Sequence, residues 1–236
     1  MRALLVVATL CLAVPVAGAK TAPVVVLDPG HDLRLNAATE PIGPGSSVQK
    51  IKDGGGARGV VTRTPEAVLN LAIARRTAAL LRRAGVRVVM TRTRTAGTSM
   101  GNVARAAVGN RAHAGLFLRV HADGSESRAT RGTSVLYPAY RRGWTDDVAA
   151  PSRRAAGLVL SELGRALAFP NRGLQRRSDV TGFNWADVPA ILVEVGFLTN
   201  PREDRLLATT RYRQLAAVGL CRGTLRFLGR PPSRCQ

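Results

Sequence analysis

The chain has 236 residues, of which 45% are hydrophobic. This is enough for one domain with a sizeable core, and a charged fraction of 21% is too low for a disordered chain. Aromatic residues make up only 4%, which argues against the stacking platforms that bind single-stranded nucleic acid. The formal net charge is +20, but its source is mostly arginine scattered along the chain, with Lys20, Lys50 and Lys52 as the only lysines. We therefore predict no nucleic-acid partner.

The first nineteen residues have the features of a secretory signal peptide. Arg2 supplies a positive start, residues 3–16 are mostly apolar, and residues 17–19 read Ala-Gly-Ala, a small-residue cleavage pattern. The apolar run is shorter than the roughly 20 residues that a membrane span needs. We expect residues 1–19 to be removed and residues 20–236 to form one exported, monomeric catalytic domain in the periplasm or cell wall, without a membrane anchor.

The cysteines agree with export. Removal of the signal peptide removes Cys11 and leaves Cys221 and Cys235. Two cysteines alone make a poor metal site, whereas an even pair in an oxidising compartment is typical of a disulfide. We predict a Cys221–Cys235 bond that ties the last helix to the C-terminal tail.

Apolar runs rich in β-branched residues alternate with helical patterns along the chain. Thr64 as N-cap and Pro65 at the first helical position predict a helix that stops at Gly85. The predicted strands are 24–27, 86–90, 116–120, 133–136 and 190–195, and the predicted helices are 65–83, 99–114 (capped by Ser99), 151–167 and 212–228. This order predicts a single α/β domain with a twisted, mostly parallel sheet and helices on both faces.

One long stretch, residues 32–63, is expected to be irregular. It contains the run Gly54-Gly55-Gly56 and a further Gly59. Loops of this length in a compact domain are usually functional or mobile. Whether the loop gates the site stays open at this point.

Four side chains are expected near the carboxyl ends of the strands, where open α/β sheets place their chemistry. His31 follows the first strand on a Pro-Gly turn, and His121 follows the strand 116–120. Glu66 lies in the first turn of a helix, and Glu194 near the end of 190–195. Two imidazoles and a carboxylate form the ligand set of a catalytic zinc site. A further carboxylate can take a proton from the zinc-bound water.

Each of these residues also has a simpler interpretation. Either histidine could be satisfied by backbone groups, and Glu66 could be a favourable charge at a helix N-terminus. Glu194 differs, because a carboxylate inside an apolar strand needs a partner to offset its burial. His113 sits late in a helix beside Arg111 and is expected at the surface, outside the site.

Four local patterns surround the candidate site residues. They are Val-Leu-Asp-Pro-Gly-His31, Glu66-x-x-x-Asn70-Leu-Ala, Val-His121-Ala-Asp123 and Pro-Ala-Ile-Leu-Val-Glu194-Val-Gly-Phe-Leu-Thr-Asn-Pro. In this order they resemble the motifs of the zinc-dependent N-acetylmuramoyl-L-alanine amidases, which cut peptidoglycan. Arg105 and Asn110 also fall where the family keeps an Arg and an Asn. The similarity spans residues 24 to about 228 and is closest in type to the single-domain, exported form of mycobacteria and related actinobacteria.

The resemblance implies roles for these residues. It makes His31, Glu66 and His121 the ligands of one zinc ion per chain and Glu194 the general base. The chain departs from the family at Asp32-Leu33, where glycines are usual, at Arg119, where a small Ser is common, and at Asp123, which replaces an Asn. The loop 32–63 is also longer than in the minimal family version.

The resemblance further implies a hydrolase that cleaves the amide bond between N-acetylmuramic acid and L-alanine, with peptidoglycan or muropeptide fragments as substrates. Three alternatives stay open. They are a zinc peptidase that cuts other stem-peptide bonds, a non-catalytic muropeptide-binding protein, and a basic nucleic-acid binder, which the signal peptide argues against. Polymer and free muropeptide are not distinguished as substrates.

Overall fold

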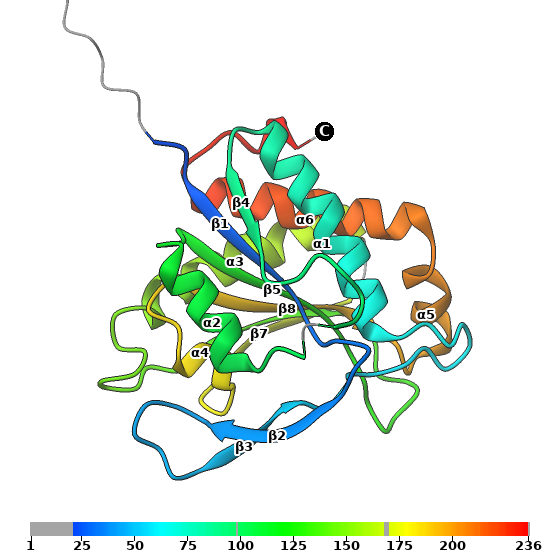
Figure 1. Ribbon diagram of the computed structural model, residues 1–236. Helices are drawn as coiled ribbons and strands as arrows, with labels where there is room; N and C mark the ends of the chain where they lie inside the picture. The colour runs from blue at the N-terminus through cyan, green and yellow to red at the C-terminus, as the bar shows by residue number, and fades with distance from the viewer. Residues whose placement is uncertain (1–20, 98, 168–169, 236) are drawn as a thin grey trace, which may run out of the picture.

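A six-stranded sheet forms the centre of the computed structural model, which describes residues 21–97, 99–167 and 170–235 (Figure 1). The strands are β1 (Val24–Pro29), β4 (Arg87–Met90), β5 (Leu116–Asp123), β6 (Thr133–Pro138), β7 (Asn171–Arg177) and β8 (Ala190–Phe197), in the order β4-β1-β5-β8-β6-β7. β4, β1, β5 and β8 are mutually parallel, whereas β6 pairs antiparallel with β8 and β7 parallel with β6. The predicted mostly parallel α/β fold is confirmed. The predicted signal peptide lies outside the described residues.

Helices cover both faces of this sheet (Figure 1). The larger core lies between the sheet and α1 (Glu66–Arg83), α3 (Ala149–Leu167) and α6 (Thr210–Phe227). A smaller core on the other face involves α2 (Asn102–Arg111) and α4 (Thr181–Asn184). The short α5 (Pro201–Leu207) follows β8, and a 3₁₀ turn, Pro232–Arg234, precedes the C-terminus. Within the described ranges, no helix is both long and apolar enough to cross a membrane.

The two central strands show why the sheet could be predicted. β8 is buried along its whole length, and β5 is buried except at Asp123. Phe117 and Leu192 enter the smaller core, while Leu118 and Val193 enter the larger one. A strand covered on both faces has an apolar run in place of alternation. The candidate site residues lie near the carboxyl ends of β1, β5 and β8.

The helix starts differ from the predictions. α1 begins at Glu66, and Pro65 rather than Thr64 holds the N-cap position, because the Glu66 N–H donates to the Ala57 carbonyl at 3.0 Å. α2 begins at Asn102 and not after Ser99, which has a φ of 41°. Its first N–H groups are capped from far along the chain, as described below.

The stretch 32–63 is not wholly irregular, which corrects the prediction. It contains an antiparallel hairpin of β2 (Asn36–Pro41) and β3 (Gln49–Asp53), set apart from the main sheet (Figure 1). Neither hairpin strand has an apolar run, and β7, the polar strand at the sheet edge, was also missed. The short helices α4 and α5 were missed as well.

The predicted disulfide is present between Cys221 and Cys235, with Cα atoms 6.0 Å apart. Both cysteines are fully buried. The bond fastens the C-terminal tail to α6, as predicted.

Candidate active site

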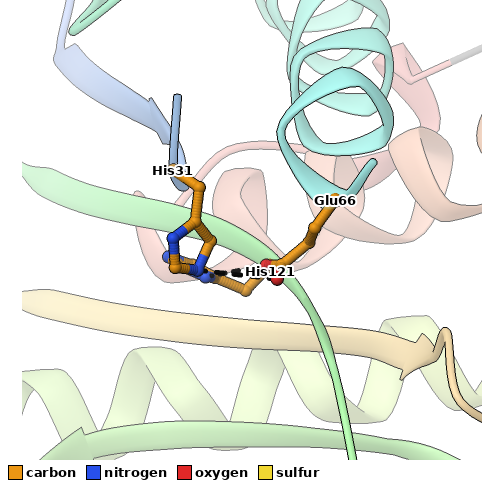
Figure 2. A group of neighbouring side chains, drawn as sticks. All are labelled: His31, Glu66 and His121. Carbon is orange, nitrogen blue, oxygen red and sulfur yellow. Dashed lines mark hydrogen bonds and ion pairs between the residues drawn. The ribbon is translucent and has the colours of Figure 1, made fainter. Parts of the chain in front are cut away.

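Three of the predicted site residues converge at one point (Figure 2). His31 comes from the turn after β1, Glu66 is the first residue of α1, and His121 projects from β5. One potential ligand atom from each lies within 4.8 Å of the others. The Glu66 carboxylate reaches both imidazoles, with Oε2 3.5 Å from His31 Nε2 and Oε1 3.1 Å from His121 Nδ1. Nothing else among the described residues forms such a cluster of histidine, cysteine and carboxylate side chains.

Two glycines leave room for this cluster. A Cβ atom at Gly30 would overlap the imidazole of His121, so no larger residue fits there. Gly56 has a φ of 70°, in the left-handed region, and a Cβ atom there would meet both the Glu66 carboxylate and the His31 ring. Positions 30 and 56 therefore need glycine, because the site side chains occupy the space that a Cβ atom would take.

A second layer of hydrogen bonds orients the three side chains. Asp53, the last residue of β3, accepts a hydrogen bond from His31 Nδ1 at 2.8 Å when that nitrogen carries the proton. This leaves Nε2 of His31 as the free lone pair. Asn70 donates to Glu66 Oε1 at 3.0 Å, and the Ala57 N–H donates to Oε2 at 2.8 Å. Both carboxylate oxygens are therefore held in place.

The electrostatics of the three groups are strongly coupled. Burial alone would raise the pKa of Glu66, but the hydrogen bond with His121 and the charges of both histidines lower it to about 2. Burial lowers the pKa of His121 to about 4. Burial would also lower the pKa of His31, but the hydrogen bond to Asp53 and the Glu66 charge raise it. The buried carboxylate of Glu66 thus lies beside two imidazole rings, whose nitrogen atoms can bind a metal ion.

Glu194 lies beside this cluster on the neighbouring strand. In the register of β5 and β8 it is the direct partner of His121. Burial and the negative charges of Glu66 and Asp123 raise its pKa well above the ordinary value. Its Oε2 atom is buried and has no hydrogen-bond partner within the described part of the chain. A buried carboxylate of raised pKa is a stronger base than an ordinary glutamate, and once protonated it can donate that proton.

Comparison with known proteins identifies the family. A family model described as N-acetylmuramoyl-L-alanine amidase matches residues 25–226. The chain belongs to the N-acetylmuramoyl-L-alanine amidase family. This confirms the family resemblance and, with it, the predicted class of hydrolase.

Relatives of this amidase include N-acetylmuramoyl-L-alanine amidase Rv3717 of Mycobacterium tuberculosis, which is 31% identical over 216 residues, with 87% of this chain and 86% of the relative covered. The AmiC amidase of Neisseria meningitidis is 28% identical, and the match covers 87% of this chain but only 53% of AmiC, so the chain spans about half of that relative. Among solved structures, the amidase Ami1 of Mycobacterium smegmatis superposes with a TM-score of 0.81 at 29% identity and covers 89% of this chain and 99% of Ami1.

Arg119, which departs from the family pattern, belongs to a cluster of buried charged residues next to the site. Asp28 on β1 accepts hydrogen bonds from Arg105 Nη1 at 2.7 Å and from Arg119 Nε at 2.8 Å. Burial alone would raise the pKa of Asp28, but the two guanidinium groups outweigh it and hold that pKa well below its usual range. Arg119 also donates to Asn102 Oδ1 at 2.7 Å. The arginine therefore links the sheet to the start of α2.

Sequence reasoning missed Asp53 and gave no role to Asn70. Asp53 stands directly before the run of three glycines, which was the one available signal, but its partner His31 is 22 residues away. Asn70 lies one helical turn after Glu66, a spacing at which side chains meet. His113, excluded by the sequence analysis, is exposed after the end of α2.

Proposed function

We propose that this chain hydrolyses the amide bond between N-acetylmuramic acid and L-alanine, with one zinc ion held by His31, Glu66 and His121 and with Glu194 as general base. The observation that carries the proposal is the convergence of these three potential ligands next to a buried carboxyl group of raised pKa. Membership of the amidase family supports the reaction class.

The donor set suits zinc. In tetrahedral sites zinc binds imidazole nitrogen at about 2.0–2.1 Å and carboxylate oxygen at about 2.0–2.2 Å, so two ligand atoms lie about 3.3–3.5 Å apart. The distances from the Glu66 oxygens to the two histidines, 3.5 and 3.1 Å, are close to this separation. Nδ1 of His121 faces Glu66, and its Nε2 is buried without a hydrogen-bond partner among the described residues, so a neutral ring offers a free lone pair in either tautomer. Two histidines and one glutamate leave a fourth position for water or substrate.

Bound zinc would supply a water of lowered pKa and polarise the scissile carbonyl. Glu194 would take the proton from the attacking water and deliver it to the departing alanine nitrogen. Its raised pKa makes the carboxylate a stronger base for the first step, and the proton that it takes up is then available for the second. Asp53 and Asn70 would keep the ligands oriented while the substrate exchanges.

The substrates proposed are peptidoglycan or its muropeptide fragments, and the chain is proposed to act as a monomer. Family membership and the disulfide together indicate a location outside the cytoplasm. Export through a signal peptide in residues 1–19, to the periplasm or cell wall, remains part of the proposal. Two alternatives would use the same pocket. A zinc peptidase would cut other stem-peptide bonds and give different products, and a non-catalytic muropeptide binder would give no products.

Mass spectrometry of products from a defined muropeptide tests the proposal. Residues 20–236, loaded with zinc, should release a peptide with a free N-terminal alanine and an intact muramic acid. A His121→Ala variant should lose both zinc and turnover, whereas His113→Ala, at an exposed position, should keep both. Fragments cut within the stem peptide would support the peptidase alternative, and full zinc content in His121→Ala would show that the ligand assignment is wrong.

A further inference from the structure

A cavity of about 140 Å³ opens directly beside two of the proposed zinc ligands. The hairpin β2–β3 forms one wall, and α2 and β5 form the others. Besides His31 and His121, its lining includes Lys52, Asp53, Arg105 and Arg119. Three of them carry a positive charge. The mechanism above uses neither these cations nor the cavity.

The charges around the cavity do not balance. Arg105 and Arg119 share a single carboxylate, Asp28, and Arg105 Nη2 lies 3.9 Å from Asp53 Oδ2. Lys52, the third cation, is half-buried and has no ion-pair or hydrogen-bond partner for its ammonium group in the described ranges of the chain. The carboxylates of Asp28, Asp53 and Asp32 act on Arg105, and Asp28 also pairs with Arg119, whereas the ammonium group of Lys52 has no ion-pair partner among the described residues. A half-buried, uncompensated cation in a cavity favours an anionic ligand.

The position of Lys52 is fixed by the docking of the hairpin on α2. Glu40 of β2 accepts hydrogen bonds from the Asn102 N–H at 2.6 Å and the Val103 N–H at 3.2 Å, and so caps the helix. The Asn102 side chain donates to the Lys52 carbonyl at 2.9 Å. A Cβ atom at Gly101 would meet Cγ of Lys52, so the lysine stem packs along that glycine. The backbone and the stem of Lys52 are therefore held at the cavity wall.

A second set of contacts holds the hairpin at the residues that directly follow Glu40. Trp185 Nε1 donates to the Pro41 carbonyl at 2.9 Å, and Asn184 donates to the Ile42 carbonyl at 3.0 Å. The hairpin is thus fastened both to α2 and to the segment around α4. A cation carried on a fastened element loses less conformational entropy when it binds a ligand than one on a loose loop.

We propose that this cavity binds a carboxylate on the peptide side of the scissile amide and that Lys52 is a specificity-determining residue for it. The inference rests on the proposed function. N-acetylmuramic acid carries no free carboxylate once its lactyl group is joined to alanine, so an anion next to the site must come from the peptide. The α-carboxyl of the second stem residue is five bonds from the scissile nitrogen, a reach of about 6 Å in an extended chain. That reach matches a cavity that adjoins the ligands.

A pair of substrates that differ only in this group tests the proposal. N-acetylmuramoyl-L-alanyl-D-glutamate carries the α-carboxylate, and N-acetylmuramoyl-L-alanyl-D-isoglutamine carries a carboxamide there. The zinc-loaded protein should have a kcat/KM about 10-fold or more higher for the acid, mainly through KM, because a charge-assisted hydrogen bond is lost with the amide. Lys52→Met should remove this preference. Lys50→Met, at an exposed position two residues away on the same strand, should keep it.

Binding measured by calorimetry separates this inference from the proposed function. Zinc-loaded Glu194→Gln should bind the acid more tightly than the amide by the same factor. Equal affinities would overturn the carboxylate site, as would an undiminished preference in a folded Lys52→Met or Lys52→Gln variant. If Glu194→Gln keeps the binding preference and the zinc-loaded wild-type protein cleaves neither compound, the amidase assignment is contradicted and the carboxylate site stands.

Discussion

His121 and Glu194 are direct partners across the parallel strands β5 and β8, near the carboxyl ends of both strands. Residues paired in this way project from the same face of a sheet, so the imidazole and the carboxyl group share one side of the site. Only the histidine contacts Glu66, and only the glutamate has a pKa raised well above its ordinary value by burial and by the charges of Glu66 and Asp123. The register of two strands thus places a proposed ligand next to a proposed proton carrier.

The first prediction concerns Glu194→Gln. The change keeps nearly the same volume and removes the group that accepts the proton, so zinc content and melting temperature should stay near wild type while turnover falls. General acid–base groups contribute about 10²–10⁴-fold, and the loss should be at least in that range. Zinc content, melting temperature and amide cleavage are measured on one preparation.

Glu162→Gln is the matched control for this change. Glu162 is a buried carboxylate on α3 that pairs with Arg165 and Arg226 and has no contact with the site. It should lower the melting temperature and leave kcat unchanged. Near wild-type cleavage by zinc-loaded Glu194→Gln would remove the role assigned to this residue, and weakened zinc retention would make it a ligand.

The second prediction concerns the disulfide. Cross-linking positions 14 residues apart should stabilise the fold by about 3 kcal/mol in the chain-entropy model. For a domain of this size, that corresponds to a loss of about 6–12 °C in melting temperature when both cysteines are replaced by alanine. Activity at low temperature should persist, because the bond lies in the tail of α6 and not in the site. Two free thiols in the unreduced, unfolded protein would contradict the prediction.

The sequence was most informative where burial imposed a pattern. β1, β5 and β8 have apolar runs because they are covered on both faces. His31 and His121, expected at the ends of two such runs, lie together with Glu66 in the structure. The hairpin β2–β3 could not be recognised, because its exposed strands carry no such run. Its role depends on contacts between distant residues. Glu40 caps α2 across 62 positions, and no local rule relates the two segments.

The third prediction concerns acid stability. Asp28 has a folded-state pKa below its value in the unfolded chain, about 3.9, because two guanidinium groups stabilise its charge. Its contribution to stability is therefore complete above about pH 4 and is lost as the pH falls further towards the folded-state pKa. Asp28→Asn should be destabilised at pH 7 by about 3–5 kcal/mol, the usual result of removing one partner of a buried ion pair. Below pH 4 its difference from wild type should shrink.

Asp179→Asn is the control for Asp28→Asn. Asp179 also pairs with an arginine, Arg177, but both side chains are substantially exposed. Exposed pairs contribute little, so this variant should follow wild type at every pH. Denaturant unfolding between pH 7 and pH 2.5 measures all three proteins. A gap between Asp28→Asn and wild type that stays constant down to pH 2.5 would exclude the linkage described here.

The last prediction concerns Asp204, a buried residue of α5 that holds the segment leading to Glu66. Its Oδ2 accepts hydrogen bonds from the Val61 N–H at 2.7 Å and the Thr62 N–H at 2.8 Å, and its Oδ1 accepts one from the Thr62 hydroxyl. This segment runs directly into the N-terminus of α1. We predict that Asp204→Asn lowers zinc affinity about 10–100-fold, the usual effect of losing an outer-shell partner, because an amide cannot accept all three bonds.

The neighbouring Glu203 supplies the comparison that makes this prediction decisive. It is also buried and also binds backbone N–H groups, at Gly132 and Phe197, but it does not touch the segment before Glu66. Glu203→Gln should destabilise the metal-free protein and leave zinc affinity close to wild type. Competition with a chelator gives the zinc affinity, and thermal melting of the metal-free variants gives the stability. If both variants lose zinc in proportion to their melting temperatures, Asp204 serves the fold in general and has no specific role in placing Glu66.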